Sequence, residues 1–226
     1  MKPALHRFGS SGSPVVVVDA VTGNLREIVD IAAALAPFPV SQTYYPGLRR
    51  IFDEADNAAM AYADALLEAA APYIGGAFDA ESFDLVEASF SIVTTHPTAL
   101  GGPQRVPHFD STDPNYLALL HYLGDTPDTG TAFYRQQSTG IELVTEANLP
   151  AFVEAAKADS AAMTGYINAS NARYAQTGRV EAVPDRLVIY RGAQLHSGII
   201  PPNMTISEDP RRGRLTANLF VRIKGE

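Results

Sequence analysis

The chain has 226 residues, of which 46% are hydrophobic and 19% charged, as expected for an ordinary globular protein with one sizeable core. Its formal net charge of −8 argues against a nucleic-acid-binding surface, because such surfaces are basic. The absence of cysteine excludes disulfides, thiolate metal sites and cysteine nucleophiles.

No apolar run reaches the roughly 18 residues that a membrane-spanning helix needs. His6 and Arg7 are followed by a Gly/Ser stretch at 9–13, where a signal peptide would need its apolar region. We therefore expect a cytoplasmic protein that binds neither membrane nor nucleic acid. The sequence leaves its oligomeric state open.

The first third of the chain predicts two helices. Asn24 to Glu27 has the spacing of a capping box, and apolar residues at helical spacing follow it. An Ala-rich amphipathic run predicts a longer helix that Gly75-Gly76 ends. The expected elements are, in order, a flexible leader (1–13), a buried strand (15–18), a helix (25–35), an aromatic turn (44–49) and a long helix (53–73).

From residue 83 the pattern changes to strands rich in β-branched and aromatic residues. The expected strands are 83–95, 108–110, 116–123, 131–136, 186–190, a short one around 196, and 214–223. A second helical insertion is predicted at about 149–173. Helices followed by at least six strands favour an antiparallel sandwich buttressed by helices, a β-rich α+β fold. We expect a single domain over 1–226, with helical support at 14–80 and the strands at 83–226.

The clearest chemical signal is Pro107-His108-Phe109-Asp110. Alternate residues of a strand face the same side, so His108 and Asp110 would lie together. A third ligand could come from His196, in Leu195-His196-Ser197-Gly198. Two histidines and one carboxylate form the ligand set of non-haem Fe(II) oxygenases, which leaves the remaining coordination positions open. Each histidine also has a plainer interpretation: His108 as a partner of Asp110 at the surface or core edge, and His196 as a satisfied core histidine.

Other candidate sites are weaker. The chain lacks G-x-S-x-G, the Walker A loop and H-E-x-x-H, so common hydrolase and NTPase signatures are absent. Neither His96 nor His121 has a carboxylate at strand spacing. If Tyr122 faces a pocket, strand alternation turns His121 away from it.

Together these features resemble the Fe(II)/2-oxoglutarate-dependent dioxygenases, nearest the prolyl-hydroxylase branch, from about residue 83 to the carboxyl end. That family's double-stranded β-helix, a cupin-like jelly roll, carries an H-x-D pair early and a distal histidine late. His108, Asp110 and His196 match this order, with a separation of 196 − 110 = 86 residues. Segments 121–124 and 129–133 are similar to the elements that follow the H-x-D pair. Tyr45-Pro46-Gly47, together with the H-x-D stretch, is similar to an uncharacterised bacterial subgroup.

The resemblance implies Fe(II), 2-oxoglutarate as cosubstrate, O₂, and ascorbate as an optional reductant. His108, Asp110 and His196 would then be both the metal ligands and the catalytic centre. The products would be succinate, CO₂ and a hydroxylated small molecule or peptide residue. Related halogenases replace the carboxylate with a small residue, so the presence of Asp110 favours hydroxylation.

The resemblance also assigns the cosubstrate site. Arg214 would bind the C5 carboxylate, because a guanidinium is planar and permanently charged, with hydrogen bonds from Thr216 and Tyr122. Thr216 could equally be a plain β-former and Tyr122 a core aromatic. The gap from His196 to Arg214 is longer than usual in the family. Three nearby arginines are therefore rivals for the anchoring role: Arg211, Arg212 and Arg222.

Two further functions stay open. The chain could be a metal-binding jelly-roll sensor or binding module without turnover. It could also be a Zn(II) hydrolase that uses the same three ligands, although no nearby glutamate stands out as its general base. The 44–49 turn and the 149–173 insertion are expected at the rim of the pocket, and their sequences name no substrate.

Overall fold

The computed structural model describes residues 3–225. Ten strands and three α-helices make up most of this part of the chain. The strands are β1 (Ala4–Phe8), β2 (Ser13–Val18), β3 (Gly47–Ile51), β4 (Ser82–Val93), β5 (Tyr116–Tyr122), β6 (Gly130–Gln136), β7 (Tyr174–Glu181), β8 (Arg186–Arg191), β9 (His196–Ile199) and β10 (Leu215–Lys224). The helices are α1 (Leu25–Ala34), α2 (Asn57–Phe78) and α3 (Leu149–Ala162), with two short 3₁₀ helices at Pro97–Ala99 and Gly102–Arg105.

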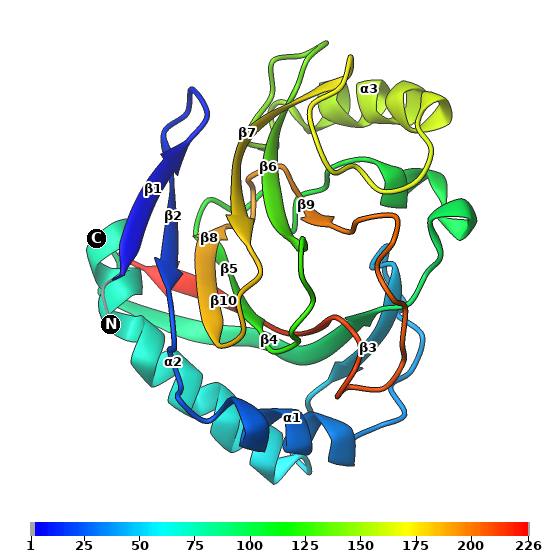
Figure 1. Cartoon of the computed structure of the whole chain (residues 1–226). Coiled ribbons are helices and arrows are strands. Elements are labelled where there is room, and N and C mark those ends of the chain that lie inside the picture. The colour runs from blue at the N-terminus through cyan, green and yellow to red at the C-terminus, as the bar shows by residue number, and fades with distance from the viewer. Residues whose placement is uncertain (1–2, 226) are drawn as a thin grey trace.

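The strands form two antiparallel sheets. The larger sheet has the order β1-β2-β8-β5-β10-β4-β3, and the smaller has the order β7-β6-β9. The smaller sheet lies over one face of the larger one, and α1 and α2 cover the opposite face (Figure 1). The structure therefore confirms the predicted β-rich jelly roll buttressed by helices.

Strand alternation in β10 separates the two faces of the larger sheet. Leu215, Ala217, Leu219 and Val221 are buried in the core shared with α1 and α2. Residues such as Thr216 alternate with them and face the space between the sheets. Burying each large aliphatic side chain stabilises the fold by about 1.5–3 kcal/mol, so the register of this strand is strongly specified. The same register places the polar set between the sheets.

The amino-terminal segment is the largest correction to the sequence-based description. Residues 4–8, expected in a flexible leader, form β1 and pair with β2 in the larger sheet. The Glu142 carboxylate accepts hydrogen bonds from the backbone N–H groups of Ser10 and Ser11 at 3.2 and 3.0 Å, which ties the β1–β2 turn to the rest of the molecule. Met1 and Lys2 lie outside the described residues.

Several predicted boundaries were also wrong. The long helix continues through Gly75-Gly76 and ends at Phe78, and Asp79 caps it in a left-handed conformation (φ 54°). The insertion is helical only to Ala162, and the strands β3 and β7 were not predicted. Residues 108–110 are a loop with one β-bridge at His108, not a strand.

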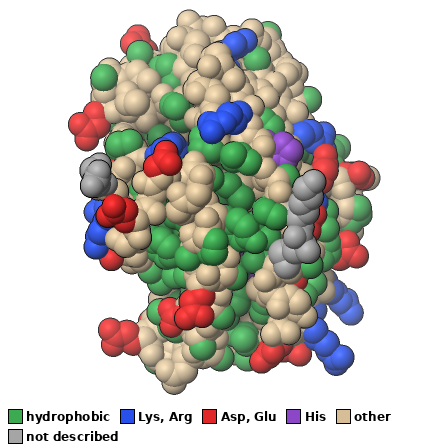
Figure 2. All heavy atoms as spheres, turned by 90° about the vertical axis from the view of Figure 1, so that its left-hand side faces the viewer, with side chains coloured by type: hydrophobic (Ala, Val, Ile, Leu, Met, Phe, Trp, Pro, Cys, Tyr) green, Lys and Arg blue, Asp and Glu red, His purple; other side chains and the backbone are tan. Residues whose placement is uncertain are grey.

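The face of the molecule that carries β1 bears charged side chains of both signs. Figure 2 shows acidic and basic side chains scattered around hydrophobic ones on this face, and they do not gather by sign. Within residues 3–225, none of the helices is both long enough and apolar enough to cross a membrane.

Candidate metal centre

The three predicted metal ligands converge between the sheets. One donor atom from each of His108, Asp110 and His196 lies within 4.8 Å of the other two. His196 begins β9, and it exchanges two backbone hydrogen bonds with His108, at 2.9 and 2.8 Å. The N–H of Asp110 donates to the carbonyl of Gly192 at 2.7 Å. Backbone contacts to the segment from Gly192 to His196 therefore bring these side chains together, rather than alternation along a strand.

Hydrogen bonding prepares His196 to bind a metal. Its Nδ1 lies 2.8 Å from the Gln194 carbonyl oxygen, which can only accept, so Nδ1 carries the proton. The lone pair of Nε2 is then free, and it lies 3.7 Å from Oδ2 of Asp110. Fixing the outer nitrogen in this way is what metal-bound histidines commonly require.

The Asp110 carboxylate fits a cation. Its Oδ2 is buried and has no hydrogen-bond partner among residues 3–225. Its Oδ1 lies 3.9 Å from Nε2 of His108, which is too long for a hydrogen bond. Leaving such an acceptor unpaired costs about 1–3 kcal/mol or more, a penalty that a bound cation would remove. Two imidazoles and a carboxylate fit Fe(II).

The protonation states agree with a ligand role. Burial lowers the pKa of His196 to about 4, and burial raises the pKa of Asp110 to about 6. Desolvation and the His196 ring also lower the pKa of His108, but 54% of that side chain is exposed, so solvent weakens the effect. Near neutral pH both rings are therefore uncharged and Asp110 is ionised, which are the forms that bind metal.

A group of buried polar side chains, which we call the enclosed compartment, lies near these ligands. It contains Arg214, Thr216, Tyr122, Thr131 and Tyr45. Arg214 is only 5% exposed; its Nη2 donates to the Gly130 carbonyl at 2.9 Å, whereas its buried Nε has no partner among residues 3–225. The Tyr122 hydroxyl shares a hydrogen bond with Thr131 at 2.7 Å.

The three rival arginines all lie elsewhere. Arg211 pairs with Asp30, Arg212 lies 3.8 Å from Asp209, and Arg222 pairs with Asp113. Their side chains are 55%, 81% and 59% exposed. They are solvated surface charges, and among these four arginines Arg214 is the one with a buried side chain.

Tyr45 is the member of this compartment that the sequence did not identify. It comes from the loop before β3, and its hydroxyl is buried without a hydrogen bond of normal geometry. Burial raises the pKa of Tyr45 to about 12, although Arg214 and Thr216 are near enough to oppose the shift. The sequence placed residues 44–49 only at the rim, because nothing local indicates that this loop enters the sheet interior.

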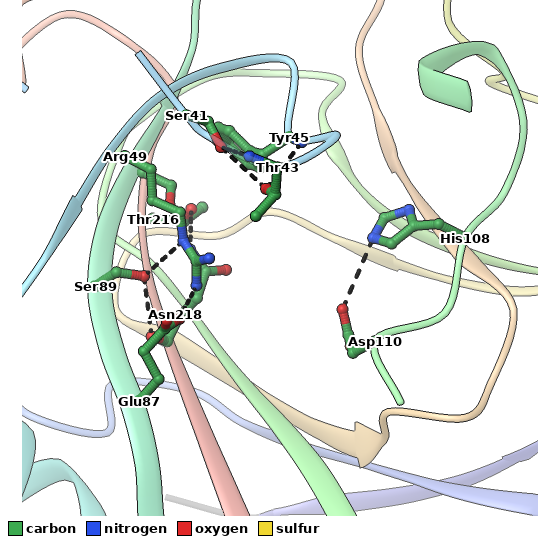
Figure 3. Close-up of polar contacts among 11 residues, drawn as sticks. Ser41, Thr43, Tyr45, Arg49, Glu87, Ser89, His108, Asp110, Thr216 and Asn218 are labelled. Atoms are coloured by element: carbon green, nitrogen blue, oxygen red, sulfur yellow. Dashed lines mark hydrogen bonds and ion pairs between the residues drawn. The ribbon is translucent and has the colours of Figure 1, made fainter. Parts of the chain in front are cut away.

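A second polar region, the open compartment, lies on the same inner face farther along the strands. It consists of Arg49, Glu87, Ser89, Ser91 and Asn218, which come from β3, β4 and β10. Figure 3 shows Arg49 on one side of the view and His108 with Asp110 on the other. The Arg49 and Glu87 side chains are 13% and 31% exposed, so solvent reaches them.

His121 lies on the opposite face of the sheet, as alternation with Tyr122 predicts. It is completely buried, and its Nε2 donates to Asp185 at 2.9 Å while its Nδ1 accepts from Tyr62 at 2.8 Å. Burial alone would raise the pKa of Asp185, but hydrogen bonds, first from His121 and then from the segment at Thr22, outweigh it and lower the pKa. This network joins α2 to the sheet and lies outside the metal centre.

Comparison with known proteins gives both a family and a fold. The model of the family of unknown function DUF6445 matches residues 1–221. No curated protein matches the chain in sequence. The structure is similar to the non-haem α-ketoglutarate-dependent epimerase SnoN from nogalamycin biosynthesis, with a TM-score of 0.52, 14% identity, and coverage of 93% of this chain and 78% of SnoN.

Two further solved structures are similar at the same level. HygX from Streptomyces hygroscopicus, with nickel and 2-oxoglutarate bound, has a TM-score of 0.50, 16% identity, and coverage of 94% of this chain and 84% of HygX. The viral collagen prolyl hydroxylase of Paramecium Bursaria Chlorella virus-1, in a 2OG complex, has a TM-score of 0.50, 8% identity, and coverage of 96% and 99%. At these identities the likeness establishes a shared fold.

Proposed function

The chain belongs to the DUF6445 family, and from its metal centre we propose that this member is a non-haem Fe(II)- and 2-oxoglutarate-dependent oxygenase. One observation carries the proposal: two buried atoms from groups of opposite charge, Asp110 Oδ2 and Arg214 Nε, have no hydrogen-bond partner among residues 3–225, and both groups lie near Tyr190. A cation and an anionic cosubstrate bound side by side would satisfy both. The fold shared with SnoN, HygX and the viral prolyl hydroxylase supports this proposal.

Each residue would have a distinct task. His108, Asp110 and His196 would hold Fe(II), which when bound with 2-oxoglutarate supplies the chemistry for activating O₂. Arg214 would bind the C5 carboxylate of 2-oxoglutarate, and the Thr216 and Tyr122 hydroxyls would donate hydrogen bonds to it. Because this anchor is buried, it would exclude water from the cosubstrate and fix its orientation relative to the metal ligands.

The reaction class we propose is hydroxylation of a small molecule or of a residue in a short peptide, with release of succinate and CO₂. SnoN has been solved in complex with nogalamycin RO, which is a small molecule. Because Asp110 supplies a carboxylate, the three side chains match the ligand set that is used for hydroxylation. The half-exposed His108 leaves one side of the metal site open for a substrate to approach.

The test is cosubstrate turnover. With Fe(II), ascorbate, O₂ and 2-oxoglutarate, the protein should form succinate slowly without its substrate, and size-fractionated metabolite extracts should accelerate the reaction. Asp110→Ala should remove both rates. If the protein binds 2-oxoglutarate but never exceeds the Asp110→Ala background, it is a sensor or binding module and the catalytic proposal fails.

A further inference from the structure

Four side chains of the open compartment form a wall that faces the metal centre. The inference drawn from this wall rests on the proposed oxygenase function. The wall-forming side chains alternate with core residues on neighbouring strands: Arg49 on β3, Glu87 and Ser89 on β4, and Asn218 on β10. In Figure 3 they lie together on one side of the view, across from His108 and Asp110. A molecule that touches this wall would therefore also lie beside the metal ligands.

A column of stacked side chains and backbone hydrogen bonds connects Arg49 to the metal centre and fixes its position. The rings of Tyr116 and Phe220 stack at 5.4 Å, and the Arg49 guanidinium lies 5.6 Å from the centroid of Phe220. At the other end, the Gly192 N–H donates to the Tyr116 carbonyl at 2.8 Å, and the Gly192 carbonyl accepts from Asp110 at 2.7 Å. The column thus runs from the Asp110 backbone to Arg49 and holds them at a set separation.

The wall presents free hydrogen-bonding atoms of both kinds. Nη2 of Arg49 pairs with Oε1 of Glu87 at 2.5 Å, and its Nε donates to Ser89 at 3.1 Å. The amide nitrogen of Asn218 donates to Ser91 at 2.9 Å. Three atoms have no hydrogen-bond partner within residues 3–225 and are not fully buried: Arg49 Nη1, Glu87 Oε2 and Asn218 Oδ1. One cationic donor therefore lies beside two acceptors, one of them anionic.

We propose that this wall binds the head group of a small zwitterionic molecule, the neighbouring ammonium and carboxylate of an α-amino acid. The carboxylate accepts from Arg49, whose planar guanidinium suits that geometry. The ammonium, which has three donors, donates to Glu87 and Asn218. Glu87 would repel a simple anion, and Arg49 would repel a simple cation. A zwitterion satisfies both, and it directs its side chain across the space towards His108 and Asp110.

Binding to metal-free protein tests this proposal separately from turnover. Each of the twenty common α-amino acids is measured individually by saturation-transfer NMR at millimolar concentration, and the dissociation constant of the best binder is then determined. Two analogues of that amino acid, one without the amine and one without the carboxylate, should each bind about tenfold or more weakly. Oxygenase activity is not needed for this result, so the failure of one proposal leaves the other standing.

Two variants assign the contacts. Arg49→Met and the isosteric Glu87→Gln should each weaken amino-acid binding about tenfold. Arg49→Met should have no further effect on the analogue that lacks the carboxylate, and Glu87→Gln should have none on the analogue that lacks the amine. A purely structural role would weaken all three ligands equally. Arg222→Met, which removes the exposed pair with Asp113, is the matched control and should bind as the wild type does.

Three results would overturn the proposal. The first is that none of the twenty amino acids binds. The second is that the deaminated acid binds as tightly as its amino acid and ignores Glu87→Gln, which would make the wall an anion site. The third is that both variants weaken every ligand equally. If Arg49→Met fails to fold, Glu87→Gln with the paired analogues still decides the matter.

Discussion

The enclosed and open compartments both adjoin the inner face of the larger sheet, yet they differ in how their polar groups are satisfied. In the enclosed compartment Arg214 is almost fully buried, and its Nε has no partner within residues 3–225. In the open compartment Arg49 is paired with Glu87 and Ser89, and solvent reaches the pair. Buried unpaired groups are costly and imply one fixed ligand, whereas groups already paired and hydrated can accept or release a ligand with little penalty. The difference suits a constant cosubstrate on one side and a selected substrate on the other.

The metal ligands border both compartments, so removing one should have the largest effect. Asp110→Ala, His196→Ala and His108→Ala should each abolish tight Fe(II) binding while the fold remains. Metal content after anaerobic loading and the circular dichroism spectrum measure the two outcomes. Wild-type affinity in all three variants would disprove the metal centre, and stoichiometric zinc that iron cannot replace would favour a hydrolase.

Replacing Arg214 should have the next largest effect, confined to the enclosed compartment. Arg214→Met should weaken 2-oxoglutarate binding by about 2–5 kcal/mol, because it removes one partner of a desolvated charge pair, while Fe(II) stays bound. The charge-transfer band of the anaerobic complex, titrated with 2-oxoglutarate, measures the loss. Arg212→Met changes an exposed arginine nearby and should leave the titration unchanged. If Arg212→Met weakens 2-oxoglutarate binding instead, Arg212 is the anchor and the assignment of Arg214 is wrong.

Removing single hydroxyls from the enclosed compartment should have a smaller effect. Tyr45→Phe and Tyr122→Phe should each weaken 2-oxoglutarate binding by about 0.5–1.5 kcal/mol, the net contribution of one hydrogen bond. Tyr44→Phe is the matched control, since Tyr44 is 74% exposed. If Tyr45→Phe behaves like Tyr44→Phe, the Tyr45 hydroxyl does not contact the cosubstrate and the compartment is smaller than described.

The smallest effect should be that of the open compartment on stability. The Arg49–Glu87 pair is reached by solvent, so Arg49→Met should change the free energy of unfolding by about 1 kcal/mol or less. Urea denaturation of the metal-free protein measures this. A loss of several kcal/mol would mean that the pair holds the sheets together. The two compartments would then differ only in how deeply their side chains are buried.

Much of the candidate site could be predicted from local sequence. The residue types at His108, Asp110 and His196 indicate their chemistry wherever they lie. Alternation in β10 places Arg214 and Thr216 on one face, and alternation in β5 separates Tyr122 from His121. The alternation in β5 and β10 follows from the sequence because the apolar residues of each strand must face the core, so a shift of one residue would bury the wrong set.

The tertiary structure alone decided the features that depend on distant pairing. Residues 4–8 look unstructured by themselves and become β1 only because β2 offers an edge beside them. Tyr45 and Arg49 reach the interior because β3 pairs with β4, about 40 residues further along the chain. His108 and Asp110 share a face without forming a strand, since His196 and Gly192 hold their backbones. Local periodicity encodes the side of an element that is buried, whereas backbone pairing between distant segments leaves almost no trace in local composition. That is why the sequence indicated the metal ligands and left the open compartment hidden.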